Sequence, residues 1–227
     1  MTPDREAPAG DRASGPGEGD AARGSAARRV AWVDAAFVAG ASAAYVAAEA
    51  LGVAKRFTYV AIGAAALLYV AYLVRRRPHT ARDLGFRRDT LRSGARPVAA
   101  FTLAAALALV AWGLARGEAP WDGRVAWLLL LYPPFATVQQ AAFQGLLHRA
   151  LRVLVGRPWV EVVGTAAAFA AVHVGNAALV GLTFVAGLAW SAAYRRWPNV
   201  WLLAASHTVL AALAYPLVLG DAPLARL

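Results

Sequence analysis

Apolar stretches of about 20 residues recur along this 227-residue chain, and short arginine-rich segments separate several of them. An α-helix needs about 17–25 mainly apolar residues to cross the hydrocarbon core of a bilayer. Apolar residues make up 59% of the chain and charged residues only 16%, whereas soluble domains carry about 25% charged residues. These features exclude a soluble monomer, a disulfide-stapled secreted domain and a disordered chain. They predict an all-α, polytopic transmembrane helical bundle.

The hydropathy pattern predicts about seven spans in one transmembrane domain over residues 30–220. The predicted spans cover residues 30–53, 57–74, 97–115, 124–148, 159–175, 177–194 and 199–218. Residues 1–29 are rich in Gly, Ala, Pro, Asp and Arg and have no apolar face, so we expect a disordered cytoplasmic tail. Pro133 and Pro134 lie inside the fourth span and are expected to kink it.

The distribution of basic residues indicates the orientation of the spans. The net charge is +10, and most Lys and Arg residues fall in the tail and in every second loop, as the positive-inside rule requires when the N-terminus is cytoplasmic. The excess therefore reflects topology, and no nucleic-acid partner is expected. Nearly all basic residues are arginine, and alanine is abundant as well, so we expect a bacterial protein of the cytoplasmic membrane. Membrane lipid is expected among its partners.

A small set of polar side chains lies within the predicted spans. Polar groups are costly in lipid, so each is a candidate for function. The candidates are Gln139, Gln140 and Gln144 on the fourth span, His173 on the fifth and His207 on the seventh. Gln140 and Gln144 share one helix face, so three helices could together form a polar pocket. The alternative is that each side chain only hydrogen-bonds to a neighbouring helix.

The remaining polar residues are assigned no chemistry. Asp34 and Glu49 lie near opposite ends of the first span, which favours interfacial positions, and Glu161 suits a helix N-terminus. His79 and His148 lie in basic loops and are expected to be solvated. Two histidines without a nearby carboxylate or thiolate make a weak zinc site. We therefore expect neither a metal nor a cofactor.

Three short motifs occur in order along the second half of the chain. They are VQQAAFQGLL at residues 138–147, FAAVH from Phe169 to His173, and His207 followed four residues later by Ala211. They resemble the Glu-Glu-x-x-x-Arg, FxxxH and HxxxN motifs of the CPBP family. That family comprises the CAAX-processing and bacteriocin-processing intramembrane endopeptidases, including the type II CAAX prenyl endopeptidases and Abi proteins. DLGFRR at 83–88 and YRRWPNVW at 194–201 extend the resemblance over about residues 83–218.

The resemblance implies a peptide or transmembrane-segment substrate and a set of site positions. The implied catalytic positions are Gln139, Gln140, His173 and His207, and the implied binding positions are Gln144, Phe169 and Ala211.

The sequence departs from the family at the polar motif positions. Gln139 and Gln140 replace the two glutamates, Gln144 replaces the arginine and Ala211 replaces the asparagine. A carboxamide cannot take a proton from water, and loss of a general base costs about 10²–10⁴ in rate. The resemblance therefore implies a degenerate peptidase site.

Three functions remain open at this stage. The first is a CPBP-like protein whose degenerate site binds a membrane segment or a lipidated peptide. The second is an active endopeptidase in which His173 or His207 serves as the base. The third is a small-molecule carrier with a polar site at the membrane midplane.

Overall fold

The computed structural model describes residues 16–76, 80–119 and 123–220, and these residues form helices with no β-strand among them. In chain order the elements are α1 (Pro16–Ala50), α2 (Lys55–Arg76), α3 (Leu91–Ala115), α4 (Gly123–Leu131), α5 (Pro133–Gln140), the π-helix η1 (Ala141–His148), α6 (Arg149–Leu154), α7 (Pro158–Ala171), α8 (Ala177–Arg196), α9 (Val200–Ala214) and the π-helix η2 (Tyr215–Leu219). The all-α prediction is confirmed.

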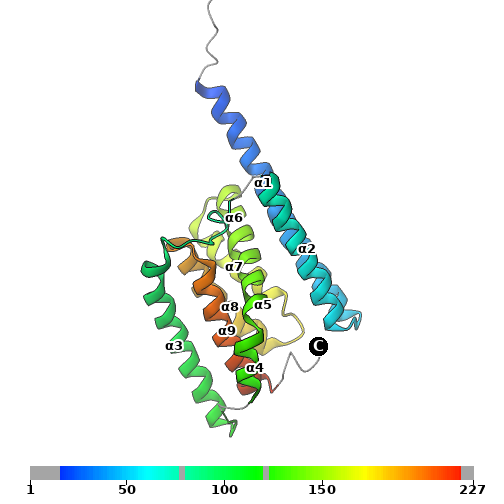
Figure 1. Ribbon diagram of the computed structural model, residues 1–227, viewed down its shortest axis with the longest axis vertical. Coiled ribbons are helices and arrows are strands. Elements are labelled where there is room, and N and C mark those ends of the chain that lie inside the picture. The colour runs from blue at the N-terminus through cyan, green and yellow to red at the C-terminus, as the bar shows by residue number, and fades with distance from the viewer. Residues whose placement is uncertain (1–15, 77–79, 120–122, 221–227) are drawn as a thin grey trace, which may run out of the picture.

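Helix α9 forms the centre of the bundle, and most of its residues are buried. Helices α3, α4 and α5 pack against it, while α7 pairs with α8. Figure 1 shows α1 and α2 side by side along one flank of the bundle and α3 on the opposite flank. Helix α1 also contacts η1 and α6, so the two N-terminal helices are joined to the rest of the bundle through that segment.

Within the described ranges, four helices are long and apolar enough to cross a membrane, namely Asp20–Ala50, Leu91–Ala115, Ala177–Arg196 and Val200–Leu219. They coincide with the first, third, sixth and seventh predicted spans. Shorter apolar helices cover Val60–Leu73 and Pro158–Ala171. The chain is therefore a helical membrane protein, but the predicted count of seven spans is not confirmed.

The N-terminal region differs from the predicted disordered tail. Helix α1 begins at Pro16, so residues 16–29 are helical, and residues 1–15 lie outside the described residues. Alanine and arginine, which dominate residues 21–29, are strong helix formers. Extending the apolar helix into this segment requires no new nucleation, which accounts for the difference.

The fourth predicted span is a series of consecutive helical segments with a break, instead of one regular helix. Helix α4 ends at Leu131 and α5 begins at Pro133, which places the interruption at the expected proline pair. Helix α5 then continues into the π-helix η1, whose hydrogen bonds join residues five apart and widen the helix. The last of these segments, α6, ends at Leu154, six residues beyond the predicted end of the fourth span.

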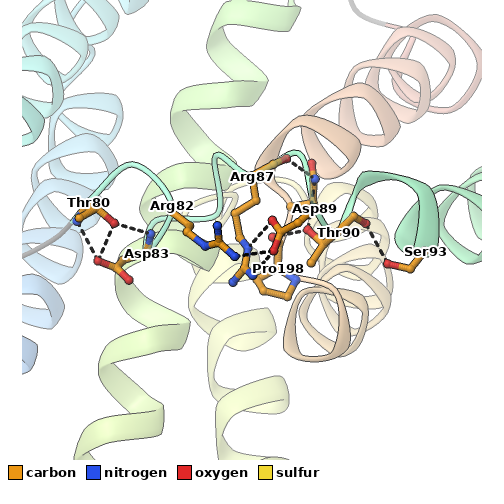
Figure 2. A network of polar contacts seen from close by, with 9 residues as sticks. Thr80, Arg82, Asp83, Arg87, Asp89, Thr90, Ser93 and Pro198 are labelled. Carbon is orange, nitrogen blue, oxygen red and sulfur yellow. Dashed lines mark hydrogen bonds and ion pairs between the residues drawn. The ribbon is translucent and has the colours of Figure 1, made fainter.

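Ion pairs fix the loop that precedes α3, as Figure 2 shows. Arg87 Nε donates to Asp89 Oδ1 at 3.0 Å and Arg82 Nη2 donates to Asp89 Oδ2 at 2.7 Å. The hydrogen bond from Arg87 lowers the pKa of the Asp89 carboxyl to about 2. Because the pKa of Asp89 is lowered, the ion pair stabilises the folded protein fully at pH values above the usual pKa range of a carboxyl group. This stabilisation is lost as the pH falls towards 2.

The same loop is attached to the start of α9. Thr90 Oγ1 donates to the Pro198 carbonyl at 3.0 Å (Figure 2), and Asn199 Nδ2 donates to the Arg87 carbonyl at 2.8 Å. The Val200 amide donates to the Gly85 carbonyl at 2.9 Å. These contacts join the DLGFRR stretch to the turn between α8 and α9, two segments separated by about a hundred residues of chain.

The loop also packs closely against η1 at a glycine of the first motif. A Cβ added at Gly145 would lie 2.8 Å from the carbonyl oxygen of Leu84. Cβ atoms in proteins do not lie so close to another heavy atom, and a backbone oxygen cannot move away as a flexible side chain can. Gly145 therefore allows the loop to cover η1.

Candidate functional site

Gln140 and His207 meet inside the bundle, where the end of α5 faces the middle of α9. Their exposed fractions are only 1% and 5%. The Gln140 amide nitrogen Nε2 lies 3.4 Å from His207 Nδ1. An amide nitrogen only donates, so this contact requires an unprotonated Nδ1. The structure thus brings together two polar residues that the sequence predicted to share a pocket.

The other two glutamines of the first motif lie in the same segment. Gln144, in η1, donates from Nε2 to Ser191 Oγ on α8 at 3.0 Å. The side-chain oxygens Oε1 of Gln139, Gln140 and Gln144 are all buried and have no hydrogen-bond partner among the residues that the structure describes. A buried acceptor left unpaired costs about 1–3 kcal/mol. The motif therefore presents three acceptor oxygens whose hydrogen-bonding capacity the described part of the chain does not use.

Phe169 links the two histidines. Its ring centroid lies 5.3 Å from that of His173 and 5.5 Å from that of His207, both in edge-on contacts. His173 Nδ1 is 2.9 Å from the Phe169 carbonyl oxygen. A carbonyl oxygen only accepts, so Nδ1 carries a proton and donates it. The buried Phe169 ring on α7 is thus flanked by two imidazoles, that of His173 on the turn after α7 and that of His207 on α9.

Aromatic rings enclose His207. Trp190 lies 4.8 Å from it and Tyr132 lies 5.5 Å from it, measured between ring centroids. Trp190 Nε1 donates to Ser206 Oγ at 2.9 Å, which fixes the indole on α8 relative to α9. The sequence analysis missed both aromatic residues. A tryptophan within a predicted span, whose N–H needs a partner, was the available signal for Trp190.

Ala211 lies one turn beyond His207 on α9 and is buried. Its methyl group provides neither a donor nor an acceptor. The position that the resemblance assigns to asparagine therefore contributes no hydrogen bond to this site.

The acidic side chains predicted to be interfacial have different environments. Glu49 is exposed, whereas Asp34 is buried and its Oδ1 accepts from Tyr69 Oη of α2 at 2.6 Å. Asp34 is therefore paired with another helix and not exposed to solvent. Since α1 begins at Pro16 and not near residue 30, Asp34 lies in the interior of the helix, where α2 supplies its partner.

His148 is fully buried, so the prediction that it is solvated is wrong. The helix continues through η1 into α6, which turns the expected loop position into a helical position packed against α7. Its Nε2 lies 3.6 Å from Glu161 Oε2, and Arg152 and Arg195 also contact that oxygen. His79 lies outside the described residues.

The two buried carboxylates among residues 16–76, 80–119 and 123–220 are Asp34 and Glu161. Asp34 binds Tyr69, and Glu161 binds two arginines. The same residues contain no cluster of three or more His, Cys, Asp or Glu side chains that could hold a metal ion. Gln140 and His207 thus meet in a neutral environment of amides and aromatic rings.

Comparison with protein families assigns the region that contains this site. Residues 120–213 match the family model described as type II CAAX prenyl endopeptidase Rce1-like. This region is similar to that family. The match confirms the resemblance seen in the motifs and runs from the segment before α4 almost to the end of α9. The matched region therefore contains all three motifs, while α1, α2 and α3 precede it. Comparisons with curated proteins and with solved structures found no match.

Proposed function

We propose that this membrane protein is an Rce1-like homologue that has lost peptidase activity and binds a membrane segment or a lipidated peptide. The three buried glutamine oxygens without protein partners are the observation that carries this proposal. They occupy the positions at which the related motif carries two acids and an arginine. We place the protein in the bacterial cytoplasmic membrane with its N-terminus in the cytoplasm, because the basic loops follow the positive-inside rule.

Loss of hydrolysis follows from the chemistry of the substituted side chains. Activation of water requires a group that can accept a proton, and the carboxamides of Gln139 and Gln140 cannot do so. Asp34 and Glu161 have partners in other parts of the bundle. Without its general base, a peptidase loses about 10²–10⁴ in rate, and the alanine at position 211 removes a potential oxyanion donor.

Retention of binding follows from the same side chains. An unwound peptide segment inside a membrane exposes N–H donors that lipid cannot satisfy. The oxygens of Gln140 and Gln144 are acceptors that need such donors. A bound segment would therefore pair its own N–H groups with the glutamine oxygens. Both kinds of group are costly to leave unpaired. Replacing the ionic positions together also avoids a buried, unpaired arginine, which would destabilise the bundle.

Binding can be measured with a farnesylated peptide that carries a photo-crosslinker, added to the full chain in lipid nanodiscs. The Gln140→Leu and Gln144→Leu variants are each expected to bind about 5–10-fold more weakly, because each loses one hydrogen bond worth about 1 kcal/mol or slightly more. Thr137→Val is the matched control on α5, since the Thr137 hydroxyl bonds to the carbonyl of its own helix at Pro133. Unchanged binding in both glutamine variants would refute the proposed binding site.

A further inference from the structure

A basic pocket lies among α6, α7 and α8, away from the glutamines. Its volume is about 420 Å³, and it is lined by Arg152, Gly156, Glu161, Ala192, Arg195 and Arg196. Three guanidinium groups and a single carboxylate thus line the pocket. The lining carries a surplus of two positive charges.

The carboxylate cannot neutralise all three arginines. One oxygen, Glu161 Oε2, accepts from Arg152 Nε at 3.2 Å and from Arg195 Nε at 3.3 Å. Glu161 is buried, while the two arginine side chains remain 46% and 45% exposed. Arg196 does not join this pair of contacts, and its guanidinium lies 5.9 Å from the centre of the Trp197 ring. The carboxylate therefore orients two guanidiniums, and the pocket still favours an anion.

An apolar groove adjoins the basic pocket. It has a volume of about 440 Å³ and lies between α3 and α8, with Phe101, Ala189 and Trp190 among its lining residues. Ala192 and Arg196 line both the groove and the basic pocket, so the two adjoin at the end of α8. Trp197, at this end of the groove, is a residue type enriched where membranes meet water.

We propose that this combined site binds an anionic phospholipid. The phosphate contacts Arg152, Arg195 and Arg196, and one acyl chain lies in the groove between α3 and α8. Guanidinium groups bind phosphate through paired, charge-assisted hydrogen bonds, and basic pockets between membrane helices suit anionic headgroups. The apolar groove favours a lipid over a free phosphate ion, because a soluble anion would leave the groove unused.

The lipid site is independent of the peptide-binding proposal. It uses the arginines of α6 and α8 and none of the glutamines of α5 and η1. The two sites adjoin at Trp190, which lines the groove and also packs against His207. Because the two sites use different polar residues, the lipid-binding proposal can be confirmed or refuted separately from the peptide-binding proposal.

Native mass spectrometry of the full chain in detergent provides the test. Phosphatidylglycerol is compared with phosphatidylcholine of the same acyl chains, and phosphatidylglycerol is expected to bind more tightly. Arg196→Gln leaves both Glu161 ion pairs intact and is expected to weaken phosphatidylglycerol binding about five-fold, the value of one basic side chain near an anionic headgroup. Arg88→Gln, at an exposed arginine before α3, is the control and should have no effect.

A second variant tests the groove and the source of the phosphate. Ala189→Phe places a ring in the groove and is expected to weaken lipid binding while leaving the weak binding of soluble glycerol 3-phosphate unchanged. Equal binding of the two lipids, or unchanged binding in Arg196→Gln, would overturn the proposal. Glycerol 3-phosphate that binds as tightly as the lipid, with no effect of Ala189→Phe, would also overturn it and would identify a site for a soluble anion.

Discussion

Replacing Gly85 by alanine is expected to destabilise the protein by roughly 2–5 kcal/mol, as the sum of two costs. Gly85 has a φ of 90°, where an L-residue incurs about 1–2 kcal/mol of strain. The added Cβ would also lie 2.7 Å from Tyr194 Cε2 and 2.8 Å from Tyr194 Oη. Tyr194 is itself buried, so the overlap adds about 1–3 kcal/mol.

Two glycine controls separate these contributions in unfolding experiments on the purified protein. Gly117 has a φ of 78° with no atom within 4 Å of its added Cβ, so Gly117→Ala should show the strain alone. Gly181 lies inside α8 with an equally open environment, so Gly181→Ala should be neutral or stabilise by up to about 1 kcal/mol. If Gly85→Ala were no worse than Gly117→Ala, the close packing of the loop against α8 would be contradicted.

Replacing Phe169 by alanine is expected to cost roughly 3 kcal/mol, the lower end of the range for Phe→Ala in soluble cores. The lower end applies because lipid surrounds the helices even when they separate. The free energy of transferring the ring out of water therefore contributes little to the cost. The ring contacts Phe143, His173, Trp190 and His207, and its removal leaves a void against all four. Both unfolding and binding of the farnesylated peptide should be affected, because the two histidines lose their common support.

Phe169→Leu is the matched control for this prediction. Leucine keeps much of the volume and should cost less than about 1.5 kcal/mol. Equal effects of the leucine and alanine variants on unfolding would show that the cost does not come from the void. Unchanged peptide binding in Phe169→Ala would show that the ring does not organise the histidines.

The sequence predicted the membrane class well, because the length and apolarity of a helix that crosses lipid are local properties. Leu91–Ala115 and Val200–Leu219 meet both requirements. The segment Gly123–Leu154 shows the limit of this approach. Its proline break is encoded locally, but the π-helix depends on how the segment packs against its neighbours, which composition does not reveal.

Burial of individual polar residues was harder to predict than the meeting of Gln140 and His207. That contact followed from polar residues at membrane depth, where lipid offers no alternative partner. His148 was misplaced because its partner, Glu161, comes from another helix. The burial of Asp34 likewise depends on a partner from another helix, Tyr69. Helix boundaries estimated from hydropathy also put both residues near span ends, whereas both lie inside helical segments.

The direct test of the central claim is hydrolysis of a farnesylated CAAX-type peptide by the full chain in lipid nanodiscs. A site with amides at positions 139 and 140 is expected to release no product above the level of the His207→Ala variant, while still binding the peptide. Robust cleavage that disappears in His173→Ala or His207→Ala would contradict the account. A rate that falls below about pH 6–7, where imidazole is protonated, would then identify a histidine as the base.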